Sequence, residues 1–104
     1  MPWGSWINDL PTEFFMVVHI AAFSLGAGFA WLAFKRDLNV LGAAFSLFAA
    51  AEVVYMTYHL DWTVFLFAHT IAEVLDLAAF VLVFAAAVYS AVRRPALNTV
   101  EVNR

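Results

Sequence analysis

Cysteine is absent from this chain of 104 residues, and lysine and arginine together number only five. Without a thiol the chain can form no disulfide, no thiolate metal site and no thiol redox centre. The basic residues never form a run longer than two, and the formal net charge is −3. A nucleic-acid partner requires clustered positive charge against its phosphates, so this class of partner is excluded.

Charged residues of both signs make up only 12% of the chain, whereas 65% of the residues are hydrophobic. A soluble domain of this length needs more polar surface, so the lipid bilayer is the expected solvent. We therefore expect an all-α integral membrane protein, a single multi-pass domain of the cell (cytoplasmic) membrane over residues 1–104. We expect no cleavable signal peptide, because no Lys or Arg precedes the first apolar stretch and that stretch is too long for a signal core.

Three apolar stretches reach the length of about 20 residues that a helix needs to cross the hydrocarbon core. They predict helices over residues 13–34, 39–59 and 62–92. Because the connections between them are short, consecutive helices should run antiparallel as an up-down three-helix bundle. The third helix is longer than the hydrocarbon core is thick, so it must tilt or protrude.

The ends of these helices carry polar signals. Three side chains stand where helix caps are expected: Thr12, Asn39 and Asp61. Residues 1–12 should form an outer interfacial segment, and residues 95–104 a polar cytoplasmic tail. We expect Pro95 to prevent the third helix from continuing without a break into that tail.

The basic residues predict the orientation of the chain. Lys35 and Arg36 lie in the first connection, and Arg93 and Arg94 follow the third helix. The amino-terminal segment and the second connection contain neither lysine nor arginine. Because basic residues in short loops favour the cytoplasmic side, we expect the amino terminus outside and the carboxyl terminus inside.

Five histidine and carboxylate side chains fall inside the predicted spans, away from their ends, where such groups are energetically costly and usually mark a site. They are His19, Glu52, His69, Glu73 and Asp76. The last three follow the spacing i, i+4 and i+7 and therefore share one helical face. At about 1.5 Å per residue, His19, Glu52 and His69 lie roughly 8 to 11 Å below the outer surface. We expect the five residues to converge in the outer leaflet.

A second stripe of polar residues runs along the second helix toward its outer end. Glu52, Tyr55 and His59 follow the spacing i, i+3 and i+7. Tyr58, His59 and Asp61 lie in or beside the outer connection. These three residues could form an opening from the predicted cluster toward the outside.

Histidine and carboxylate side chains can bind zinc, iron or copper, and the five residues supply enough ligands for one metal ion. The same groups can relay protons, because histidine titrates near neutrality and burial raises the pKa of a carboxylic acid in general. A haem is not expected, because no outer Arg or Lys would meet its propionates. A structural role is the alternative, with His19 bonded to a neighbouring helix and Glu52 paired with His69.

Small residues on the first two helices indicate close packing, since they let helix backbones approach in lipid. They are Ser24, Gly26 and Gly28 in the first helix and Gly42, Ala43, Ala44 and Ser46 in the second. Two interpretations remain open, a contact between these helices within the chain and a contact between chains.

Three helices enclose too little volume for a gated substrate cavity, so the function should require partners. Our leading hypothesis is an accessory subunit of a larger membrane complex, such as a respiratory or metal-dependent oxidoreductase, with a cluster that binds metal or relays protons. One alternative is a homo-oligomeric channel or carrier for protons or divalent metal. Another is a membrane sensor or regulatory module. The expected partners are other membrane subunits or further copies of the chain, and the bilayer itself.

Overall fold

The computed structural model describes residues 2–102, with side chains described through residue 93. A 3-10 turn, η1 (Ser5–Asp9), precedes three α-helices, α1 (Thr12–Lys35), α2 (Asn39–His59) and α3 (Phe65–Val102). The described part of the chain contains no strand. Each of the three helices includes a stretch long and apolar enough to cross a membrane. The predicted all-helical fold with three candidate spans is confirmed.

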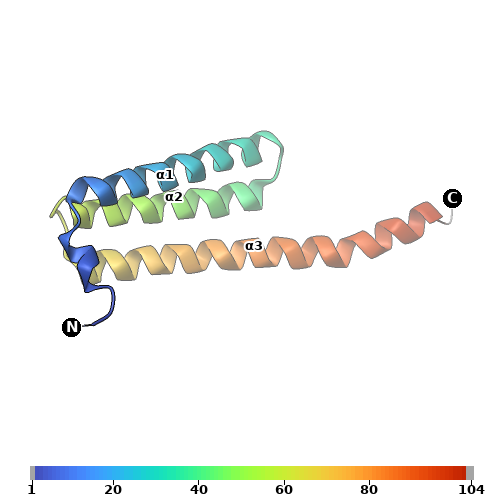
Figure 1. Cartoon of the computed structure of the whole chain (residues 1–104). Coiled ribbons are helices and arrows are strands. Elements are labelled where there is room, and N and C mark those ends of the chain that lie inside the picture. The colour runs from blue at the N-terminus through green and yellow to red at the C-terminus, as the bar shows by residue number, and fades with distance from the viewer. Residues whose placement is uncertain (1, 103–104) are drawn as a thin grey trace.

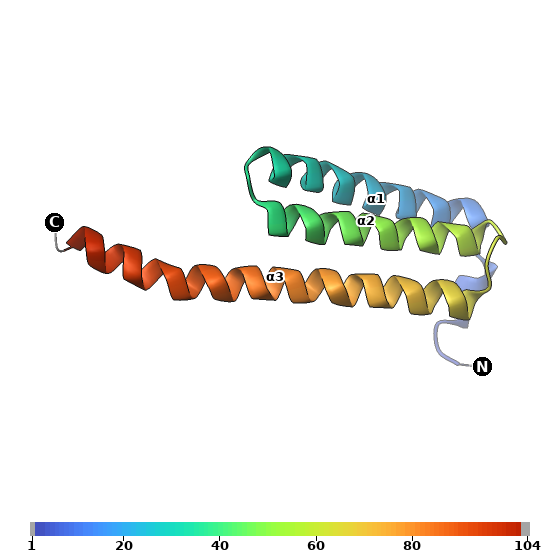
Figure 2. The same ribbon diagram turned by 180° about the vertical axis from the view of Figure 1, so that it is seen from behind.

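The three helices lie side by side as a layer with α2 in the middle (Figure 1). The view from behind shows the same order, and α1 and α3 make no contact with each other within the described chain (Figure 2). The molecule measures 65 × 31 × 20 Å, as expected for a flat and elongated arrangement. Consecutive helices are antiparallel as predicted, but they do not close into a bundle with an interior of its own.

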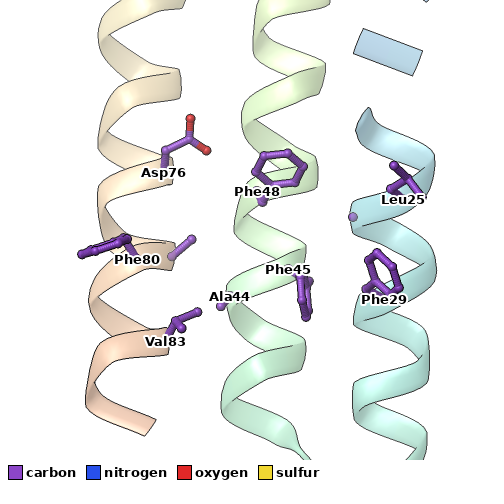
Figure 3. Close-up of a pocket in the computed structure, with 10 residues that line it drawn as sticks. Leu25, Phe29, Ala44, Phe45, Phe48, Asp76, Phe80 and Val83 are labelled. Atoms are coloured by element: carbon purple, nitrogen blue, oxygen red, sulfur yellow. The ribbon is translucent and has the colours of Figure 1, made fainter. Parts of the chain in front are cut away.

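The layer is open because α2 has small residues on two nearly opposite flanks. Gly42 and Ala49 pack against α1, whereas Ala44 and Ala51 lie about 200° around the helix from them. Ala44 and Ala51 are 2% and 0% exposed, and Ala44 lies on the side of α2 that faces α3 (Figure 3). The sequence shows that these residues are small. Only the positions of α1 and α3 show that the small residues lie on two different flanks of α2.

Gly26 and Gly42 explain how closely α1 approaches α2. A Cβ atom at Gly26 would lie 2.9 Å from the Phe48 ring, and one at Gly42 would lie 2.6 Å from the Phe34 ring. A Cβ at Gly28 would meet nothing within 4 Å. The interpretation of a contact within the chain therefore holds for Gly26 and Gly42, while Gly28 lies on an open surface.

The residues predicted to cap the helices do not occupy the cap positions. Thr12 and Asn39 are the first helical residues, Pro11 and Leu38 occupy the cap positions, and neither cap makes a side-chain hydrogen bond. Asp61 has a positive φ of 63° and lies in the turn before α3. A short polar side chain tolerates this left-handed conformation, so Asp61 forms the turn and does not cap the helix.

Helix α3 begins at Phe65 and not at residue 62, and it continues through Pro95 to Val102 and not only to residue 92. Residues 95–102 are therefore helical, which corrects the prediction of a separate tail. Proline removes one backbone N–H, and its ring crowds the carbonyl four residues earlier, so a helix that continues through it bends. The red end of α3 bends away from the line of the rest of the helix in Figure 1.

Candidate functional site

A hydrogen bond between His19 and Glu52 joins α1 to α2. His19 Nδ1 lies 2.5 Å from Glu52 Oε2, and Glu52 is only 8% exposed. A carboxylate can only accept, so the imidazole donates from Nδ1. The two residues meet because His19 is the eighth residue of α1 and Glu52 the eighth from the end of its antiparallel neighbour. The contact places one proton between two ionisable groups.

Aromatic rings hold the His19 imidazole in position. The ring of Tyr55 stacks on it with 5.3 Å between ring centroids, and the His59 ring lies 5.1 Å away. The other face of His59 is close to Phe15, with which it stacks at 4.8 Å. These four rings form a column between α1 and α2, toward the end of the layer that holds the α2–α3 connection.

Tyr55 links this column to α3. Its hydroxyl donates a hydrogen bond of 3.3 Å to Glu73 Oε1. Glu73 and Glu52 both lie close enough to Asp76 to interact with it electrostatically. Asp76 Oδ1 is buried and finds no hydrogen-bond donor among the side chains that the structure describes. Glu73 therefore contacts the Tyr55 hydroxyl directly, and the carboxyl groups of Glu52 and Asp76 lie near enough to influence it.

Six residues define this arrangement, which we call the polar cluster. They are His19, Glu52, Tyr55, His59, Glu73 and Asp76. Glu52 and Tyr55 belong to α2, so the middle helix connects the groups of the two outer helices. Of the five ionisable residues expected to converge, His19 and Glu52 contact each other, Glu73 contacts Tyr55, and Asp76 lies near both glutamates.

His69 is the fifth residue, and the structure places it apart. Its ring is exposed and stacks on Phe65 of its own helix, with 5.2 Å between centroids. The preceding residue, Ala68, is fully buried. Because successive residues of a helix point about 100° apart, His69 lies on the flank of α3 and not against α2. The expected pair of His69 with Glu52 is replaced by the pair of His19 with Glu52.

Among the predicted metal ligands, only His19 and Glu52 contact each other directly. Within residues 2–93, no three His, Asp or Glu side chains are arranged so that they could hold one metal ion. Zinc sites in proteins use three or four protein ligands. As arranged here, the residues fit proton-sharing hydrogen bonds better than metal coordination.

The predicted outer opening is partly occupied by rings. Tyr58 meets the His59 ring edge-on at 4.9 Å and the Phe65 ring at 5.3 Å, whereas Asp61 is exposed in the turn. His59 belongs to the polar cluster as well as to the predicted opening. Phe15 and Tyr55 were not predicted as site residues. Their spacing was a usable signal, since Phe15 precedes His19 by four residues and Tyr55 follows Glu52 by three.

A groove of about 400 Å³ begins at Asp76 and extends away from the polar cluster. All three helices contribute to it across one face of the layer, as Figure 3 shows. The residues that line it are Leu25, Gly26, Phe29, Ala44, Phe45, Phe48, Asp76, Ala79, Phe80 and Val83. Asp76 is the one ionisable residue of this lining, so the face changes from polar to apolar at Asp76.

The fold and the site define a helical protein with three candidate membrane spans and a polar cluster of ionisable and phenolic groups. No known protein family matches the chain, and neither a curated protein nor a solved structure is similar to it.

Proposed function

We propose that the chain is a subunit of a membrane complex and that the polar cluster passes protons between the outer surface and a partner protein. The observation that carries this proposal is the hydrogen bond of 2.5 Å between His19 and Glu52. An imidazole and a carboxylate at this separation share one proton, which either group can give up or take. A proton relay needs such pairs in sequence.

The groups beside this pair supply further steps. The His59 ring, 5.1 Å from His19, lies toward the α2–α3 connection, and Tyr55 donates from the other side to Glu73. Each of these groups can both donate and accept a proton when it changes its protonation state. No hydrogen bond among the described residues joins His59 to His19. The proposed path from His59 to the His19–Glu52 pair, and from Glu52 to the carboxyl groups of α3, therefore includes bridging water.

The placement in a membrane rests on the helices and on the basic residues. Each candidate span is mostly exposed, as expected if lipid covers it. Lys35 and Arg36 lie at the α1–α2 connection, the end of the layer opposite to the polar cluster. With basic loops on the cytoplasmic side, the amino terminus and the polar cluster are on the outer side.

The need for a partner follows from what the layer leaves uncovered. His69 and Glu73 are exposed on a candidate span, where ionisable side chains are costly to place against lipid and usually face protein or water. The groove below Asp76 has an otherwise apolar lining, so it offers no polar path toward the opposite end of the layer. An assembly that takes up or releases protons near its outer face, such as a respiratory or metal-dependent oxidoreductase, would use such a subunit.

Infrared spectroscopy of the purified protein between acidic and neutral pH tests the proton role. We expect the histidine ring bands and a protonated carboxyl band of the wild type to change together. Glu52→Gln should remove this coupling, whereas the control Asp9→Asn, in the exposed η1 segment, should leave it intact. Histidine bands that titrate identically in wild type and Glu52→Gln would contradict the proposal.

A further inference from the structure

One flank of α3 carries a stripe that the rest of the described chain covers only in part, through the contact of Tyr55 with Glu73 and the partial burial of Asp76. The stripe consists of His69, Glu73, Asp76, Phe80 and Val83, spaced three or four residues apart. Its last three members line the groove (Figure 3). Phe80 is 71% exposed, and its ring stands clear of α2 in that view. On a membrane span, this stripe would bring ionisable groups into contact with hydrocarbon unless protein covers them.

We infer that this face binds a second copy of the same chain in a parallel, two-fold symmetric dimer. The inference deepens the proposed function, on whose membrane placement it rests, because it names the partner. The stripe is self-complementary, since it contains a donor, His69, and an acceptor, Glu73, one turn apart. Across a two-fold axis parallel to α3, His69 of each copy approaches Glu73 of the other, as charged pairs do in parallel coiled coils.

The apolar part of the face is complementary to itself as well. The exposed Phe80 ring of each copy is placed to enter the groove of the other, where it would meet the rings of Phe29, Phe45 and Phe48. Two-fold symmetry forms this contact twice. The groove of each copy then holds the Phe80 ring of the other copy. The two open layers together form one closed six-helix arrangement.

The area of the face is sufficient for a stable dimer. The layer is 31 Å across, and about 30 Å of its length lies in the hydrocarbon core, which gives a face of roughly 900 Å². A specific interface buries about 800 Å² on each partner. In the dimer the polar clusters of both copies lie inside protein and not at the lipid boundary.

Cross-linking in native membranes tests this arrangement. Because the chain contains no cysteine, an introduced cysteine is its only thiol. Ala87→Cys places a thiol on the stripe, seven residues after Phe80. Ala85→Cys is the matched control, an exposed alanine about 200° around the same helix. With a short thiol-to-thiol linker we expect the Ala87→Cys chain to form covalent dimers and the Ala85→Cys chain to remain monomeric.

A second measurement uses native mass in mild detergent. Phe80→Ala should weaken the dimer association constant roughly tenfold. The control Phe67→Ala removes an equally large exposed ring from the other side of α3 and should leave the dimer unchanged. A dimer insensitive to Phe80→Ala would overturn the inference.

The remaining outcomes are also decisive. Equal cross-linking of the two cysteine variants, no cross-link in either, or a cross-link from Ala87→Cys to a different protein would each overturn the second-copy inference. A dimer in which the histidine and carboxyl bands titrate independently would support the dimer interface and contradict the proton role. A monomer in which these bands titrate together would support the proton role and contradict the dimer.

Discussion

His19 and Glu52 are 33 positions apart in the chain, yet they share a hydrogen bond of 2.5 Å between α1 and α2. The bond forms because a connection of three residues turns α2 back along α1 and brings the two side chains to one level. It joins the ring column of His59 and Tyr55 to the carboxyl groups beside α3. Its removal should therefore affect both stability and proton exchange.

Replacing His19 with leucine should destabilise the protein, because it leaves the buried Glu52 carboxyl group without its donor. We expect a loss of about 3 to 5 kcal/mol in the free energy of unfolding, the range for removing one partner of a buried pair. Denaturant titration in mixed micelles measures this value. His19→Leu combined with Glu52→Leu should recover most of the loss, whereas strictly additive losses would contradict a coupled pair.

Replacing Tyr55 with phenylalanine should uncouple Glu73 from the polar cluster while the stacking on His19 is kept. The lost interhelical hydrogen bond should lower the free energy of unfolding by about 0.6 to 1.7 kcal/mol. Tyr58→Phe is the matched control, because Tyr58 packs through its ring. If the hydrogen bond between Tyr55 and Glu73 acts as one unit, adding Glu73→Gln to Tyr55→Phe should bring little further change in the infrared titration.

Gly42→Ala should displace the Phe34 ring that packs between α1 and α2, since its new Cβ would lie 2.6 Å from that ring. Overpacking of this kind lowers the free energy of unfolding by about 1 to 3 kcal/mol. Gly28→Ala, which meets nothing within 4 Å, should instead be neutral or stabilising by up to about 1 kcal/mol. Phe34→Leu should partly rescue Gly42→Ala. An unchanged stability in Gly42→Ala would show that the two helices do not approach this closely.

Single cysteines should report the orientation in intact cells. Asn8→Cys lies in η1 on the proposed outer side, and Asn39→Cys lies beside the basic connection. A membrane-impermeant thiol reagent should label the first chain in intact cells and the second only after the membrane is opened. The opposite pattern would place the polar cluster on the cytoplasmic side and remove the outer-face proton role.

Much of the site could be predicted because the rise along a helix is a local property. Counting residues from the predicted ends placed His19 and Glu52 at one level, and Glu73 and Asp76 below His69 on one stripe. Both ends of α3 differ from the predicted ones, because Asp61 forms a turn with positive φ and Pro95 does not end the helix. Neither effect can be read from the residue type alone, because each depends on the backbone on both sides.

The sequence by itself determined that the chain forms three long apolar helices, and which ionisable residues share a level along them. Hydrophobic length and helical rise follow from neighbouring residues, so no distant part of the chain can change them. Only the tertiary structure decided that the helices form an open layer, that His19 and not His69 meets Glu52, and that Tyr55 connects α2 to Glu73. These outcomes depend on how far each helix is rotated about its own axis, and that rotation is set by contacts such as Gly26 against Phe48 between residues far apart in the chain.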